Sequence, residues 1–237
     1  MYKPDYKKTA DGYAYDYPRA SITTDCVIFG FNGHDLQVLL IRRGVEPYKD
    51  SWALPGGFLK MNETVAECAF RELQEETTLQ PETLEQFGVF SDVERDPRGR
   101  VVTIAFYALV KQALVKGGDD AADAQWFPLK QLPHLAFDHY DILKEAQLAL
   151  KRDIHHQPVA FRLLAEHFSM TQLQRLYEDI LETQFDRRNF YKKMLASGVI
   201  TEQKPEDDAK HKLKKLFSFN LTAYADMKKK STNNQEF

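Results

Sequence analysis

Two runs of apolar and β-branched residues near the start of the chain are separated by a short polar turn. The runs extend from Ile22 to Phe31 and from Gln37 to Arg42, and Asn32-Gly33-His34-Asp35 lies between them. Runs of this length, bounded by Asn and Gly, are typical of paired strands. The pattern therefore predicts an antiparallel hairpin.

A helical pattern follows the Pro-Gly-Gly break at residues 55 to 57. From about Thr64 to Thr77, the apolar residues Val65, Ala69 and Leu73 recur at helical spacing, so they share one face. We expect Ala66 and Phe70 to lie beside this face. The other face is charged and carries Glu67, Arg71, Glu72, Glu75 and Glu76.

Three more strands and one helix are expected before residue 153. The strands are Leu84 to Asp92, Val101 to Val110 and Trp126 to Pro128, and the helix is Tyr140 to Arg152. Because the strands flank one polar helix, the pattern predicts an α+β sandwich over residues 1 to 152.

The remainder of the chain predicts two helices followed by a hairpin. Ser169 and Gln172 have the spacing of a capping box ahead of an apolar stripe formed by Leu173, Leu176, Tyr177, Ile180 and Leu181. Asp186 can cap a second helix, Arg187 to Ala196, closed by Gly198. Two short apolar runs then bracket a charged turn, Gly198-Val199-Ile200 and residues 215 to 219, which suits a two-stranded wing.

These patterns divide the chain into four parts. We expect a first domain at residues 1–152, a linker at 153–158 that contains two histidines and a proline, a second domain at 159–226 and a disordered tail at 227–237.

Composition excludes a membrane protein. With 237 residues, 43% of them hydrophobic, the chain can bury the core of two small domains, but no run approaches the roughly 20 apolar residues of a membrane span. The first 19 residues lack the apolar stretch of a signal peptide, so we expect a cytosolic (cytoplasmic) protein with no membrane partner. Cys26 and Cys68 lie in apolar and helical runs, which predicts buried, reduced thiols.

A net charge of −3 conceals an asymmetry between the two parts. Residues 1 to 150 hold 16 basic and 23 acidic residues, a net of −7, whereas residues 151 to 237 hold 16 and 12, a net of +4. A basic domain joined to an acidic one suggests different partners, and nucleic acid is the usual partner of a basic domain. A random surface imbalance is the alternative that charge alone leaves open.

The charged helix has the residues for a metal site. On a helix, Glu72 lies one turn from both Glu75 and Glu76, so carboxylates project side by side beside the glycine turn. Hard cations such as Mg²⁺ or Mn²⁺ take oxygen ligands and leave positions open for phosphate. The alternative is a solvated helix face, and Arg71 could pair with one of these glutamates.

The whole segment resembles the Nudix box. Its spacing is Gly57, five residues, Glu63, seven residues, and then Arg71-Glu72-Leu73-Gln74-Glu75-Glu76. The resemblance implies a Nudix α/β/α sandwich whose metal ligands are Gly56 or Gly57 (through a carbonyl), Glu72 and Glu76. Glu75 would be a further metal ligand or the partner of Arg71, and Arg71, Glu75 and Glu76 would be the catalytic residues. The glycine that closes the box is Thr78 here, which is unfavourable if that position is left-handed.

An arginine-rich loop suggests the ligand. Residues 94 to 100, Glu-Arg-Asp-Pro-Arg-Gly-Arg, are similar to the loop of Nudix enzymes and sensors that handle ADP-ribose. Guanidinium groups can clamp diphosphate or ribose oxygens, so the expected ligand-binding residues are Arg42, Arg95, Asp96 and Arg98, with Arg43 as a further candidate. Another nucleoside diphosphate sugar is the alternative ligand. The general base is not identified among Glu94, Asp119, Asp120 and Asp123.

The second part of the chain resembles Nudix-related transcriptional regulators. The resemblance rests on residues 135 to 139, on the run from Phe168 to Glu178 and on Asp186-Arg-Arg-Asn-Phe-Tyr-Lys-Lys, and it covers nearly the whole chain. It implies a C-terminal winged helix-turn-helix domain that binds double-stranded operator DNA as a homodimer. Its recognition helix would contact DNA through Arg187, Arg188, Asn189, Lys192 and Lys193, with Phe190, Leu195 and Met194 facing the core.

Two functions are therefore expected, and they are compatible. One is a DNA-binding transcriptional regulator whose Nudix domain binds ADP-ribose, or a related nucleotide or sugar metabolite, and retains Mg²⁺-dependent hydrolysis. The other is an ADP-ribose pyrophosphatase, a Nudix hydrolase, whose extra domain only assembles the dimer.

Overall fold

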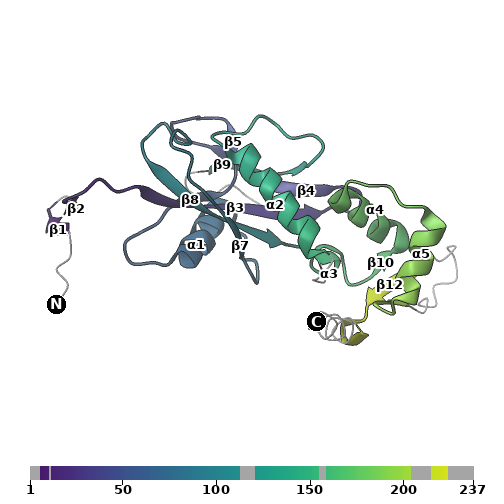
Figure 1. Ribbon diagram of the computed structural model, residues 1–237. Helices are drawn as coiled ribbons and strands as arrows, with labels where there is room; N and C mark the ends of the chain where they lie inside the picture. The colour runs from purple at the N-terminus through teal and green to yellow at the C-terminus, as the bar shows by residue number, and fades with distance from the viewer. Residues whose placement is uncertain (1–5, 11, 113–120, 155–158, 204–214, 224–237) are drawn as a thin grey trace, which may run out of the picture.

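The computed structural model describes residues 6–10, 12–112, 121–154, 159–203 and 215–223. The expected tail, residues 155–158 of the expected linker and the turn of the wing lie outside these ranges. A small hairpin, β1 (Tyr6–Thr9) and β2 (Gly12–Tyr15), extends from one end of the molecule (Figure 1).

A mixed sheet forms the centre of the first domain. The hairpin predicted from the sequence is confirmed as β3 (Ser21–Phe31) paired antiparallel with β4 (Leu36–Arg43). The sheet has the order β5-β4-β3-β8-β7, in which β3 and β8 are parallel, while β6 pairs with β3 and β9 pairs with β4. The remaining bounds are β5 (Trp52–Ala53), β6 (Gly56–Phe58), β7 (Glu85–Phe90), β8 (Val101–Leu109) and β9 (Ala121–Pro128).

One helix covers each face of this sheet. Strand residues alternate between two cores: Cys26 and Ile28 pack with α1 (Val65–Thr77), whereas Val27 and Phe29 belong to the core that includes α2 (His139–Asp153). The α/β/α sandwich is thus confirmed (Figure 1).

Phe70 lies beside the buried face of α1, as expected, and is 37% exposed. The bounds of one strand were wrong. The last strand begins at Ala121 rather than Trp126, since its alanines and Asp123 continue the antiparallel register with β4.

The second domain has the element order of a winged helix. It contains α3 (Val159–Leu163), β10 (Phe168–Ser169), α4 (Met170–Leu181), α5 (Arg187–Ala196), β11 (Ile200–Glu202) and β12 (Leu216–Phe219). The three strands form an antiparallel sheet in the order β10-β12-β11. The capping box at Ser169 and the cap at Asp186 are both present.

The helices of this domain pack largely as the sequence predicts. Leu173, Leu176 and Ile180 are buried, and Phe190 anchors α5. Leu195, in contrast, is 38% exposed, so its predicted burial was wrong: Phe190 is the buried residue of α5, and Met194 rather than Leu195 packs against the core near the end of the helix.

The two domains share a continuous core and polar contacts. Apolar residues of α2, α3 and α4 belong to one cluster. The Leu36 amide donates to Asp179 Oδ2 on α4 at 2.8 Å, and the same carboxylate pairs with Lys130 at 2.5 Å. The start of β4 is therefore held against α4.

Candidate functional site

The site is a pocket of about 370 Å³ between the α1 carboxylates and the charged loop after β7. Its walls come from β3, β4, the segment from Leu54 to Lys60, α1, and the start of α2. Most of the site residues expected from the sequence lie here: Gly56, Gly57, Glu72, Glu76, Arg95, Asp96 and Arg98. Arg42 does not, because it points outward to Asp50, whereas the neighbouring Arg43 lines the pocket.

The glycine turn and the carboxylate helix fit closely together. A Cβ atom on Gly57 would lie 2.4 Å from the Glu72 carboxylate, and one on Gly56 would lie 2.0 Å from the Thr24 carbonyl oxygen. The Gly56 amide also donates to Glu76 Oε2 at 2.8 Å. Only glycines allow β6 to approach both glutamates.

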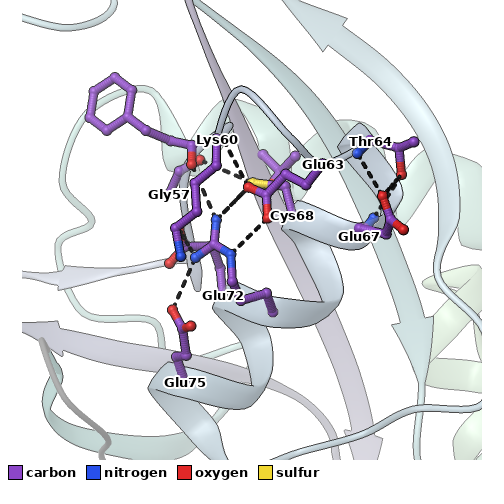
Figure 2. Close-up of polar contacts among 11 residues, drawn as sticks. Gly57, Lys60, Glu63, Thr64, Glu67, Cys68, Glu72 and Glu75 are labelled. Carbon is purple, nitrogen blue, oxygen red and sulfur yellow. Dashed lines mark hydrogen bonds and ion pairs between the residues drawn. The ribbon is translucent and has the colours of Figure 1, made fainter. Parts of the chain in front are cut away.

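Arg71 pairs with three surrounding glutamates, Glu63, Glu72 and Glu75, which are labelled in Figure 2. Its guanidinium pairs with Glu63 at 2.6 Å, Glu72 at 2.7 Å and Glu75 at 3.0 Å. The hydrogen bonds that Glu63 accepts, chiefly from Arg71, lower the pKa of Glu63 to about 2. Glu75, whose side chain is 43% exposed, is therefore held by Arg71.

The carboxylates that face the pocket lack enough positive charge around them. Burial raises the pKa of Glu76 to about 8, and the Gly56 amide only partly opposes it. Burial also raises the pKa of Glu72 despite its contact with Arg71. A cation near both groups would reverse these shifts.

These residues fit a divalent cation. Glu72 and Glu76 supply hard oxygen donors beside the Gly56-Gly57 turn, and Mg²⁺ binds in proteins through one or two carboxylates while keeping waters. No cluster of three or more His, Cys, Asp or Glu side chains arranged for a metal is found among the described residues. The expected set of Gly56, Glu72, Glu75 and Glu76 therefore has two carboxylates in the pocket, with Glu75 turned to Arg71.

A buried ionic chain forms the floor of the pocket. Arg95, with a side chain only 4% exposed, donates two hydrogen bonds to Asp138 at 2.7 and 2.8 Å and contacts Asp25 at 3.3 Å. His139 Nδ1 accepts the Leu54 amide hydrogen bond, and its Nε2 lies 3.5 Å from Asp25 Oδ1. Burial lowers the pKa of His139, so the ring is neutral. Arg95 thus has its hydrogen bonds satisfied inside the protein.

Two other arginines present cationic faces to the pocket. Arg98 pairs with Asp96 at 2.7 Å and lies 4.8 Å over the Phe58 ring, and Arg43 lies 4.9 Å over the Phe137 ring. Burial, together with the nearby Arg98 charge, lowers the pKa of Arg43. Two like charges close together favour an anionic ligand between them.

Sequence reasoning missed Asp25 and Phe137. Asp25 is the single acidic residue in the apolar run of β3, and an isolated charge in a buried strand was the available signal. Phe137 has a left-handed backbone (φ 52°), a conformation that costs energy and that no sequence pattern indicates. Of the general-base candidates, Glu94 is exposed, and Asp119 and Asp120 lie outside the described residues.

The second site is the exposed face of α5. All five expected DNA-contacting residues, Arg187, Arg188, Asn189, Lys192 and Lys193, are exposed. Within the described residues, none of the four cations forms an ion pair. His211, Lys212 and Lys214 of the expected wing are not described, and Lys215 pairs with Glu202 at 2.7 Å.

The fold and these two sites define a class of protein: a Nudix-type domain joined to a winged-helix domain. Family models agree, since the NUDIX domain matches residues 20–146 and the NrtR DNA-binding winged helix domain matches residues 160–219. The chain belongs to the Nudix family and carries an NrtR-type winged helix.

Similar proteins extend over both domains. The chain is 35% identical to the ADPR responsive transcriptional repressor NtrR of Acinetobacter baylyi, over 88% of this chain and 86% of that one. It is 48% identical to an ADP-ribose pyrophosphatase of Methanocaldococcus jannaschii over 47% of this chain and 66% of that one. The crystal structure of Shewanella oneidensis NrtR with a 27mer DNA is 25% identical, with a TM-score of 0.67 over 86% of this chain and 95% of that one.

The Nudix domain also matches a ligand complex. The cocrystal structure of the Shewanella oneidensis NrtR NUDIX domain with ADP ribose is 32% identical, with a TM-score of 0.54 over 56% of this chain and 90% of that one.

In the described part of this chain, no helix has the length and apolar character needed to cross a bilayer.

Proposed function

We propose that this chain is a DNA-binding transcriptional repressor that responds to ADP-ribose. One observation carries the proposal: an arginine-lined pocket that also contains the carboxylates of Glu72 and Glu76 is joined in one chain to a recognition helix whose cations have no ion-pair partner among the described residues. The similarity to the Acinetobacter baylyi repressor over both domains supports this combination.

ADP-ribose suits the chemistry of the pocket. Arg43 and Arg98 can hold the diphosphate, and the exposed Phe58 ring offers a face for stacking. The Shewanella oneidensis complex with ADP ribose supports this ligand. Arg95 and Asp96 have a positioning role, because Arg95 ties the loop to Asp138 and Asp96 orients Arg98.

DNA suits the second domain. The N-terminal turns of α5 present Arg187, Arg188 and Asn189, which can contact phosphates or base edges in the major groove. Operators read by such domains are commonly two half-sites, so the protein would act as a homodimer on double-stranded DNA.

We further propose that the pocket retains pyrophosphohydrolase activity. Mg²⁺ held by Glu72, Glu76 and the Gly56 carbonyl would polarise the phosphoryl oxygens and lower the pKa of the attacking water. Arg71 fixes Glu72, the Gly56 amide orients Glu76, and Arg43 and Arg98 hold the diphosphate near them. The products would be AMP and ribose 5-phosphate.

The second candidate is an ADP-ribose pyrophosphatase whose winged helix only assembles the dimer. The complete set of box carboxylates and the Methanocaldococcus jannaschii relative favour it. Binding to duplex DNA distinguishes the two candidates, because an assembly domain has no need of it.

The hydrolysis proposal is tested by incubating the purified full-length protein with ADP-ribose and Mg²⁺ and following AMP release. We expect release that Glu76→Gln reduces at least about a hundredfold, a typical loss on removing a metal ligand of a catalytic site. Glu145→Gln is the matched control, because Glu145 is an exposed carboxylate on α2 that does not line the pocket. Equal activity in wild type and Glu76→Gln would remove Glu76 from the reaction, and ADP-ribose binding without turnover would leave a sensor only.

A further inference from the structure

A second, basic groove lies where the Nudix domain meets the winged helix. Its volume is about 640 Å³, and its walls come from the β3–β4 turn, the start of α4, the start of α5 and β12. It is separate from the ligand pocket, with which it shares no lining residue. The residues on which the argument depends are Gly33, His34, Thr171, Arg175, Arg187 and Lys215.

The charge of this groove is one-sided. Arg175, Arg187 and Lys215 contribute three permanent cations and His34 an imidazole, while no carboxylate is among the described residues that line it. Lys215 has a partner outside the lining, Glu202. An anion of extended shape fits such a surface better than any neutral ligand.

The Nudix turn is a built part of the groove wall. Asn32 Oδ1 accepts hydrogen bonds from the His34 and Asp35 amides, each at 2.8 Å, which fixes the turn. A Cβ atom on Gly33 would lie 3.1 Å from Gln172 Nε2 of α4, so the turn rests against the capping box of that helix. Arg175 donates a hydrogen bond to His34 Nδ1 across the domain boundary.

The groove also continues the expected DNA-binding surface. Arg187 is the first residue of α5 and lines the groove with its exposed side chain, beside Arg188 of the recognition face. In helix-turn-helix proteins, the helix before the recognition helix crosses the phosphate backbone while the recognition helix enters the major groove. The start of α4 with Arg175 occupies that place here.

We propose that this groove holds the phosphodiester backbone of duplex DNA, so that the Nudix turn around His34 belongs to the DNA interface. The inference rests on the proposed DNA-binding function and extends it to the other domain. Because the turn would touch both α4 and the DNA, the affinity for DNA would depend on how the Nudix domain is positioned.

The test uses the full-length protein and a 30-base-pair duplex of mixed sequence, whose binding depends on phosphate contacts. The equilibrium dissociation constant is measured against salt concentration for wild type, His34→Glu, His34→Lys and Arg175→Ala. We expect His34→Glu to weaken binding by about tenfold at low salt and His34→Lys to tighten it. Arg175→Ala should lower the slope of log affinity against log salt by about one.

Two controls make the result specific. Lys144→Ala on α2 removes an exposed cation that does not line the groove, and it should change neither affinity nor slope. Arg188→Ala reports the recognition helix. His34 and Arg175 are exposed, and melting curves show whether each variant is folded.

The outcomes separate this inference from the function on which it rests. If wild type binds and Arg188→Ala weakens binding, but both His34 variants and Arg175→Ala match wild type, the groove is not a DNA contact and the inference is overturned alone. Absence of wild-type binding at low salt would overturn the proposed DNA binding as well. Opposite shifts for His34→Glu and His34→Lys would support the inference.

Discussion

Thr78 is the residue at which this chain departs from the Nudix box, and its backbone keeps the left-handed conformation of the missing glycine. Its φ is 62°, and its amide caps α1 by donating to the Gln74 carbonyl. A β-branched residue is disfavoured in this conformation. The helix therefore ends as in a glycine-closed box, and the carboxylates keep their positions.

Thr78→Gly should stabilise the protein by roughly 0.5 to 1 kcal/mol, because the relief of strain exceeds the entropy cost of a glycine. Denaturant unfolding measures the change. Thr77→Gly is the control: Thr77 is buried within the helix and donates to the Leu73 carbonyl, so it should destabilise. A lower stability for Thr78→Gly would mean that the threonine hydroxyl outweighs the strain.

The protonation of Glu76, a residue of the expected metal site, makes the stability of the protein depend on pH. Its folded pKa, about 8, lies above the ordinary value of 4.5, so the unfolded state ionises first as pH rises. The stabilisation from the neutral carboxyl is complete below about pH 4.5 and is lost as pH rises to about 8. Ionised Glu76 is then the form that a cation would stabilise.

We therefore predict that the metal-free protein loses a few kcal/mol of stability between pH 5 and 8 that Glu76→Gln does not lose. At pH 8, Mg²⁺ should raise the melting temperature of wild type more than that of Glu76→Gln. Melting curves with EDTA or Mg²⁺ measure both effects. Identical pH profiles for the two proteins would contradict the assignment of a buried, uncompensated carboxyl.

At the scale of elements, the sequence predicts the long ones. α1 and α4 follow a helical apolar period because one face of each packs against a core, whereas β3 and β8 are continuous apolar runs because both of their faces are buried. β5 and β6, with two and three residues, are too short to show a period. The start of β9 is rich in alanine, which has low strand propensity, so only its pairing with β4 reveals it.

The pocket residues also divide into those that the local sequence predicts and those that it does not. The box spacing places Glu72 and Glu76 correctly, because local helix geometry determines their positions. The roles of the arginines depend on partners far along the chain: Arg95 pairs with Asp138 and Asp25, 43 and 70 residues away. Arg95 was expected to bind the ligand, but this pairing gives it a structural role. No local sequence pattern predicts a partner so far along the chain.

Asp179 makes one of the contacts that join elements of the two domains. Its side chain, 10% exposed, accepts the Leu36 amide at the start of β4 and pairs with Lys130. β4 ends at Arg43, which lines the ligand pocket. One strand thus connects the pocket to the first helix of the helix-turn-helix.

Asp179→Ala should destabilise the protein by about 1 to 3 kcal/mol, because it leaves a partly buried amide without its acceptor. Glu182→Ala is the matched control at the C-cap of α4: its carboxylate, 63% exposed, pairs with Lys151, and its loss should cost less than about 1 kcal/mol. Urea unfolding compares them. Equal effects would show that the Leu36 contact adds nothing to the domain junction.

For the whole molecule, the charge division matches the two proposed ligands. The acidic first domain lines its ligand pocket with arginines, whereas the basic second domain carries cations on an exposed helix. A shared core and the Asp179 contacts leave the domains in direct physical contact. Binding at one site can therefore change the other.

The measurement that tests this account most directly is the DNA affinity of the full-length protein with and without ADP-ribose. A duplex selected from a random-sequence library by binding to the protein serves as the probe, with Mn²⁺ and Mg²⁺ omitted to prevent hydrolysis. We predict that saturating ADP-ribose changes the dissociation constant of the duplex by about five- to a hundredfold, and that the duplex changes ADP-ribose affinity by the same factor. Binding of both ligands with no effect of either on the other would contradict the account.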